Sequence, residues 1–212
     1  MALAWLLVLE LVLYAGCFIC GIMSAASLTI TQGHFAGQCI LYGTIESNTS
    51  GLVLDSPSHP SLCYFVSAIS VSVAIYCFSL TLYWIYTSFV EHEVKRERRW
   101  LNVTLGVCLK IVFFLTVSGC ILRIGRDSLC LSVLHNVPSI NRCEEAENTT
   151  WIRPYDGSQF YEGLYSAEKS VWVNLFFWLL IMAVVFAQKH HVLGSGSEWS
   201  VSETQPLFHR PV

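Results

Sequence analysis

Charged side chains are scarce in this sequence. Only 13% of its 212 residues are Asp, Glu, Lys or Arg, whereas a soluble domain carries about 25%. Hydrophobic residues make up 54% of the chain, which favours a membrane protein over a soluble one. The net charge of −3 supplies no basic face, and nucleic-acid binding requires one. We therefore expect a lipid bilayer, and no nucleic acid, as a partner.

Motifs that would indicate an enzyme are also missing. The sequence has no Gly-rich phosphate loop and no nucleophile elbow. His190 and His191 have no matching Cys or His group, so no metal site is expected. Cys17 and Cys20 in CFIC have redox spacing, as in a quinone-linked oxidoreductase, but thiols inside an apolar helix are usually inert. We predict that the protein is not an enzyme and has no catalytic residue and no cofactor.

Four hydrophobic runs are long enough to cross a bilayer, which takes about 20 residues. They cover about residues 3–28, 62–90, 101–124 and 171–188. In lipid these runs must be helices, because open strands would leave backbone groups unpaired. The predicted fold is an all-α membrane protein with a four-helix transmembrane bundle over residues 1–189. The composition of residues 190–212 predicts a disordered cytosolic tail.

An alternative for the first run is a signal peptide, because GIMSAASL ends in small residues as a cleavage site does. Three observations favour a retained helix instead. Residues 1–10 contain no Lys or Arg, the run is longer than that of a signal peptide, and Glu10 interrupts it.

Basic residues predict which loops face the cytosol. The short connection EHEVKRERRW holds four of them, namely Lys95, Arg96, Arg98 and Arg99. The connection at about residues 31–61 has no Lys or Arg. Basic residues near helix ends stay in the cytoplasm, so we predict cytosolic termini and two exoplasmic loops. Three arginines of the second long loop weaken this count without reversing it, namely Arg126, Arg142 and Arg153.

Glycosylation acceptors agree with this topology. Asn48 and Asn148 each begin an Asn-X-Ser/Thr triplet in a loop assigned to the outside. A third triplet, at Asn102, lies at the cytosolic end of the third helix and is expected to remain unmodified.

Cysteine usage also agrees. Cys39, Cys63, Cys130 and Cys143 fall in the outer loops, where an oxidising compartment favours two disulfides. Three pairings exist. We favour one disulfide per loop, Cys39 with Cys63 and Cys130 with Cys143.

The outer loops also contain structural signals. In the first loop, Ile40 to Ile45 and Leu52 to Leu54 flank the turn-rich SNTSG, a pattern that predicts a β-hairpin. In the second, aromatic residues of SQFYEGLYSAEKSVW fall at helical spacing, so the fourth helix is expected to begin outside the bilayer. These aromatics are read as an interfacial belt, with a partner-docking surface as the alternative.

Two charges interrupt the apolar runs at comparable depth. Glu10 shares a helix face with Tyr14 and small residues that permit close packing. Lys110 lies about 14 Å into the third helix from its cytosolic side. Because an isolated charge in lipid is costly, we hypothesise an intramembrane Glu10–Lys110 pair. Its role is read as a packing contact or an ion path. The alternative is no contact, with Glu10 neutral and Lys110 extended toward the headgroups.

The tail sequence ETQPLF is close to an acidic dileucine sorting signal. Glu203 lies four residues before Leu207, but Phe208 replaces the second Leu or Ile. An ordinary polar tail is the alternative interpretation.

Loop motifs separate the known four-span families. The sequence lacks the Gly-Leu-Trp of claudins, the Cys-Cys-Gly of tetraspanins and the three cysteines per loop of connexins. TQGHFAGQCILYG, PSLCYFV, CILRIG, QFYEGLYSAEKSVWVNL and EWSVSET resemble the transmembrane protein 179 family, B-type. The resemblance implies a multi-pass protein of plasma membrane and secretory-granule membranes, and it assigns no catalytic residue.

The features together predict a non-enzymatic tetraspan protein that binds other membrane proteins or aids their sorting. The disulfide-bonded loops, the aromatic outer segment and the sorting-like tail motivate this hypothesis. The alternative is a small channel or transporter subunit that uses Glu10 and Lys110.

Overall fold

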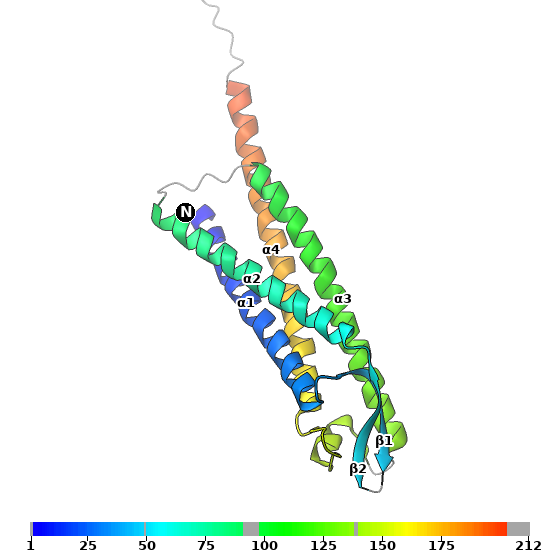
Figure 1. The fold of residues 1–212 in the computed structure, drawn as a ribbon. Coiled ribbons are helices and arrows are strands. Elements are labelled where there is room, and N and C mark those ends of the chain that lie inside the picture. Colours follow the sequence, from blue (N-terminus) through cyan, green and yellow to red (C-terminus); the bar gives the residue numbers. More distant parts are fainter. Residues whose placement is uncertain (1, 49, 91–97, 138–139, 203–212) are drawn as a thin grey trace, which may run out of the picture.

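Four long helices form an elongated bundle in the computed structural model, which describes residues 2–48, 50–90, 98–137 and 140–202. The helices are α1 Ala2–His34, α2 Ser61–Val90, α3 Arg98–Asn136 and α4 Phe160–Ser202 (Figure 1). All four are long and apolar enough to cross a membrane, over Trp5–His34, Ser61–Thr87, Trp100–Asn136 and Phe160–His190. The predicted fold class is therefore confirmed.

Buried positions recur along the helices every seven residues. In α3 they include Leu101, Cys108, Leu115, Leu122 and Leu129. In α4 they include Phe160, Ala167, Asn174, Ile181 and Gln188. A sustained seven-residue repeat winds helices of 3.6 residues per turn into a left-handed supercoil with coiled-coil packing. The four helices thus pack along one continuous inner seam.

Small and polar side chains are buried in this bundle beside large apolar ones, and many other large apolar side chains lie on its surface. Ser24 of α1 and Ser70 of α2 are buried and hydrogen-bonded at 3.2 Å. A Cβ atom at Gly21 would lie 2.8 Å from the Ser70 carbonyl oxygen, so glycine is needed for this close approach. Trp5 and Phe113 are more than half exposed. Lipid covers apolar surface without cost, and small residues let helix backbones approach, as membrane bundles require.

The first long loop is a β-hairpin at one end of the bundle, which we call the loop end. Strands β1 Cys39–Asn48 and β2 Gly51–Ser58 pair antiparallel, with Ile45 opposite Leu54. A register shift between Cys39 and Thr44 marks a bulge. Ile45 and Leu54 are buried while Glu46 is exposed, so alternation directs one face of the hairpin toward the bundle. The hairpin prediction is confirmed.

The second long loop folds against this hairpin. It contains the 3₁₀-helix η1 Cys143–Asn148, after which Trp151 forms a parallel bridge with Leu52. The Trp151 ring packs edge-on against Phe35 and Phe160, with ring centroids 5.3 and 5.6 Å apart. Aromatic pairs of this geometry add to the energy of burial. The two loops therefore form one packed layer.

Two disulfides tie this layer to the helices. Cys39 pairs with Cys63 at the start of α2, and Cys130 of α3 pairs with Cys143 of η1. This is the favoured pairing of one disulfide per loop.

Four helix ends differ from their expected positions. α1 continues beyond residue 28 to His34. α3 continues beyond residue 124 to Asn136, and α4 begins at Phe160, well before residue 171. The Glu147 carboxylate accepts hydrogen bonds from the N–H groups of Tyr161 and Glu162, at 2.8 and 3.0 Å, which caps the start of α4. α4 also continues to Ser202, where a disordered tail from residue 190 was expected. Extending an existing helix is cheap compared with starting one.

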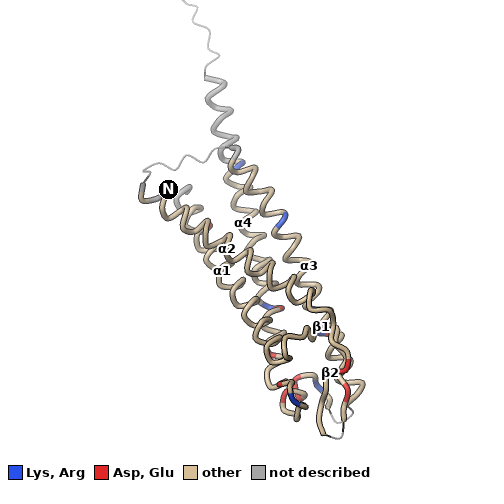
Figure 2. The backbone as a smooth tube through the Cα atoms, in the orientation of Figure 1, with Lys and Arg blue, Asp and Glu red and all other residues tan. Residues whose placement is uncertain are grey.

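Within the part of the chain that the structure describes, charged residues gather at the loop end. Figure 2 shows red and blue segments gathered there, while the rest of the bundle is mostly tan. The opposite end, which we call the termini end, holds the start of α1 and the end of α4 (Figure 1).

Candidate functional site, a charged network beneath the loops

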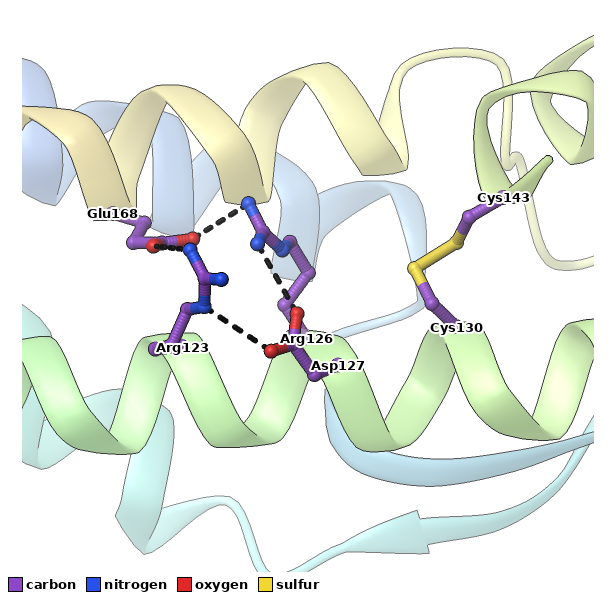
Figure 3. A network of polar contacts seen from close by, with 6 residues as sticks. All are labelled: Arg123, Arg126, Asp127, Cys130, Cys143 and Glu168. Carbon is purple, nitrogen blue, oxygen red and sulfur yellow. Dashed lines mark hydrogen bonds and ion pairs between the residues drawn. A yellow bond between two sulfur atoms is a disulfide. The ribbon is translucent and has the colours of Figure 1, made fainter.

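Four charged side chains join α3 to α4 directly below the second disulfide. Arg126 of α3 and Glu168 of α4 form an ion pair of 2.6 Å between Nη1 and Oε2. Arg126 also donates to Asp127 at 3.1 Å. Arg123 bridges the same two acids, reaching Asp127 at 3.1 Å and Glu168 at 3.3 Å. Figure 3 shows this closed arrangement one helical turn from Cys130.

The inner half of this network is buried and the outer half is not. The side chains of Glu168 and Arg126 are 3% and 9% exposed, whereas those of Arg123 and Asp127 are 57% and 49% exposed. Removing one member of a buried ion pair leaves an uncompensated charge and costs about 3–5 kcal/mol. Exposed pairs contribute about 1 kcal/mol or less. The Arg126–Glu168 contact is therefore the part of the network on which stability depends.

Aromatic rings enclose the buried arginine. The Arg126 guanidinium lies 5.9 and 5.6 Å from the ring centroids of Tyr161 and Tyr165, and these rings are stacked on each other. Lys169 also lies over one of these two rings, 5.2 Å from the Tyr165 centroid. The aromatic segment expected at the start of the fourth helix thus holds cations through cation–π contacts.

The hairpin is fixed to this platform by hydrogen bonds. The Ser132 hydroxyl of α3 accepts from the Ile45 N–H at 2.9 Å, and the Asn136 amide donates to the Ile45 carbonyl at 2.7 Å. Leu52 of β2 donates its N–H to the Thr150 carbonyl at 2.9 Å. Both loops are therefore held in register with α3.

Asn48 and Asn148 are exposed at the tip of this assembly. Asn48 pairs with Gly51 across the hairpin turn, and the Gly51 backbone lies against Thr150 of the second triplet. The third triplet residue, Asn102, is exposed near the start of α3, at the termini end. The structure thus groups the two loop acceptors and separates the third from them.

A hydrogen bond also links the end of α1 to the second loop. His34 contacts Asp156 at 3.2 Å between Nδ1 and Oδ2. The pKa of Asp156 is lowered from its ordinary value, first by the backbone N–H of Ser158, which donates to its carboxylate, and then by His34. Asp156 is therefore a stable anion at neutral pH.

Glu10 and Lys110 are not brought together. Glu10 is 2% exposed and accepts hydrogen bonds from Tyr14 at 3.0 Å and from Gln188 at 3.3 Å. Lys110 is exposed on α3, and no ion pair joins the two among the described residues. The inward residue of α3 at this level is Cys108, and two further positions turn a helix by about 200°. The hypothesised pair is therefore corrected to two separate groups.

The remaining candidate groups form no reactive cluster. Cys17 contacts Cys77 and both are buried, whereas Cys20 is half-buried. No group of three or more His, Cys, Asp or Glu side chains suited to a metal occurs in the described part of the chain. His190 packs on Phe186 at 4.9 Å between ring centroids. Three residues of the sorting-like motif lie outside the described residues, namely Glu203, Leu207 and Phe208.

Sequence reasoning missed the Arg126–Glu168 pair. In the sequence, Arg126 counted only as one of three loop arginines that weaken the topology prediction, and Glu168 was read as part of an aromatic interfacial segment. The available signal was Arg123 and Asp127 at helical i,i+4 spacing. It implied that the third helix continues and that charged residues occupy one of its faces.

Comparison with known proteins defines the family. Residues 6–208 match the family model described as "Transmembrane protein 179/179B Claudin domain". The chain is 56% identical to transmembrane protein 179B of Danio rerio, over 100% of this chain and 99% of that protein. It is 43% identical to the proteins of the same name from Homo sapiens and Mus musculus, over 98% of this chain and 96% of each of them.

No solved structure matches. The family description includes a claudin domain even though Gly-Leu-Trp is missing, so the absence of that motif does not separate this chain from claudin-type domains. A match over nearly the whole chain, together with four spans and two disulfide-bonded loops, shows that the chain belongs to the transmembrane protein 179/179B family.

Proposed function

We propose that this protein is a non-enzymatic accessory subunit that binds other membrane proteins or aids their sorting. Its termini are cytosolic, its loop end is exoplasmic, and it resides in the plasma membrane, secretory-granule membranes or both. The observation that carries the proposal is the construction of the loop end. Two disulfides and the buried Arg126–Glu168 pair hold both loops as one rigid surface.

The rigidity of the loop end supports a binding role, because fixing flexible segments on binding costs free energy and lowers affinity. Each flexible side chain or loop that must be fixed on binding lowers the free energy gained, and a pre-organised surface avoids that cost. Hydrogen bonds fix the hairpin to α3, and a bridge between Leu52 and Trp151 joins the two loops. Few segments of the loop end therefore have to be ordered when a partner binds. A small ectodomain built this way suits recognition of a partner's exoplasmic surface.

The proposed topology has two further supports. Asn48 and Asn148 are exposed at the same end as both disulfides, while Asn102 lies at the other end. Glycosylation and disulfide formation both occur in the secretory compartment. The separation of Glu10 from Lys110 leaves the channel or transporter alternative without its charge pair.

Affinity capture of the tagged full-length protein in mild detergent tests the proposal. We expect a stoichiometric membrane-protein partner with the wild type. Replacement of both Cys130 and Cys143 by Ser should reduce capture about tenfold, because the second loop loses its fixed conformation. Cys120→Ser is the matched control, since Cys120 is an exposed free thiol of the same helix, and it should capture normally.

Two results would contradict the proposal. One is that the double Cys→Ser variant is monodisperse and captures as much partner as the wild type does. The other is selective solute flux through the purified wild type in liposomes with no stoichiometric partner in cells.

A further inference from the structure

We propose that the α2–α3 face around Lys110 binds a transmembrane helix of another protein, one that carries an Asp or Glu within the membrane. This proposal rests on the accessory role proposed above and specifies the chemistry of the partner. It concerns a surface distinct from the loop end.

Lys110 is exposed inside the hydrophobic span. It lies about 15 Å along α3 from Trp100 and about 20 Å from Arg123, and tryptophan marks the membrane interface. Lys110 forms no ion pair among the described residues, and the neighbouring Leu109 and Phe113 are more than half exposed. An ammonium in such surroundings is costly until a polar or anionic partner meets it.

An apolar groove runs beside the lysine. It has a volume of about 340 Å³ and is lined by the Lys110 stem, by Ile69, Val73 and Tyr76 of α2 and by Ile111 and Phe114 of α3. α2 and α3 pack together less extensively than the other adjacent helix pairs, and they diverge toward the termini end (Figure 1). The groove therefore places apolar side chains of both α2 and α3 beside one cation.

Gly106 adds a second, independent observation. It lies one turn from Lys110 on the same face of α3 and is exposed, and a Cβ atom placed there would meet no atom within 4 Å. Glycine on the lipid-facing side of a helix permits close backbone approach by another helix. At Gly21, by contrast, the space is already filled by α2. The space over Gly106 is thus open to another helix beside the cation.

Charge complementarity identifies the occupant. Among its described residues, a second copy of this chain offers no suitable carboxylate, because Glu10 and Glu168 are 2% and 3% exposed and the other described acids of the spans lie at the loop end. Anionic lipid headgroups lie at the membrane surface, whereas Lys110 lies about 15 Å from the interfacial Trp100. A transmembrane helix can place its carboxylate at that depth.

A designed single-span peptide tests this directly. The probe is a Leu/Ala helix of about 20 residues with a central Glu, which places the carboxylate about 15 Å from either end. Energy transfer between the labelled full-length protein and labelled peptide is measured in phosphatidylcholine vesicles. We expect the Glu peptide to bind about 3- to 30-fold more tightly than the same peptide with a central Leu, as for interhelical polar contacts in membranes.

Variants of the protein define the surface. Lys110→Met should abolish the preference for Glu, and Lys110→Arg should retain it. Gly106→Leu should weaken binding of the Glu peptide without affecting folding, because its side chain enters open space. Ala15→Leu is the matched control, since Ala15 is also exposed in a span but on α1, and it should bind as the wild type does.

Three results would overturn the proposal. They are equal binding of the Glu and Leu peptides, a Glu preference that survives Lys110→Met, and self-association of the protein that Lys110→Met removes. If the cellular partner is captured equally by the wild type and by Lys110→Met, this surface is not the one used, while the accessory role itself stands. If no cellular partner is found, the accessory role fails, and the peptide measurement still reports on the surface.

Discussion

Neutralising Glu168 tests whether the buried ion pair holds the loop platform on the bundle. Glu168→Gln keeps the side-chain size but leaves Arg126, which is 9% exposed, without its 2.6 Å partner. Asp127 and the two tyrosine rings compensate in part, so we expect a loss near the lower end of the range for broken buried pairs, about 3 kcal/mol. This loss corresponds to a change of about 150-fold in the unfolding equilibrium.

A double-mutant cycle separates the pair from its surroundings. Arg126→Met should lower the free energy of unfolding by about as much as Glu168→Gln does. The double variant should lower it by about as much as either single variant. The resulting coupling energy is about 2–3 kcal/mol. Arg123→Met is the control, because Arg123 belongs to the same network but is 57% exposed, and it should cost less than about 1 kcal/mol.

Equilibrium unfolding in mixed micelles, followed by tryptophan fluorescence, measures these differences. Trp151 and Trp178 report on the loop layer and on the bundle core respectively. The reasoning is refuted if the coupling energy is below about 0.5 kcal/mol, the range of exposed pairs, or if Arg123→Met destabilises as much as Arg126→Met does.

Three further perturbations have defined outcomes. Replacing Cys130 and Cys143 by Ser should lower stability by about 3 kcal/mol, because their sequence separation of 13 sets the loop-closure entropy; an unchanged unfolding midpoint would contradict this. Gly21→Leu should lower the free energy of unfolding by about 2–3 kcal/mol, because the larger side chain overpacks against α2. The unfolding midpoint and the expression yield should both fall, and wild-type values of both would count against the observed packing. The pKa of the Asp156 carboxylate is lowered first by Ser158 and then by His34. These contacts therefore contribute stability above the unfolded-state pKa and lose it as pH falls through the folded-state pKa; an NMR titration midpoint at or above the ordinary value for aspartate would disagree.

The spans, the hairpin and the disulfide pattern could be predicted because each has a local signal. Bilayer thickness sets the length of an apolar run, and a turn-rich SNTSG between β-prone runs predicts a hairpin. Oxidising conditions limit the pairing of Cys39, Cys63, Cys130 and Cys143 to three choices, of which the structure has the local one. These signals require no knowledge of how the helices rotate.

Helix rotation is what the sequence left undetermined. In a membrane both faces of a helix can be apolar, so hydrophobicity does not tell the inner seam from the lipid-facing side. The seven-residue repeat of buried positions fixes Cys108 inward and therefore Lys110 outward. Depth alone had suggested that Glu10 and Lys110 meet. Two charges at the same level can still lie on different sides of a bundle.

Helix ends were misplaced for a related reason. Arg126 was assigned to the second long loop, since an isolated charge ends an apolar run. Its partners, Asp127 and Glu168, come from the same helix and its neighbour. Pairing lets α3 and α4 continue with charged residues on their contact face, and this pairing could not be inferred before the two helices were placed side by side.

Mapping carbohydrate on Asn48, Asn102 and Asn148 of the protein made in mammalian cells tests the central claim most directly. Because the disulfide-bonded loop end is proposed to lie outside the cytosol, we expect sugar on Asn48 and Asn148, a mobility shift lost on glycosidase treatment, and an unmodified Asn102. Sugar on Asn102 with none on the two loop acceptors would contradict that claim.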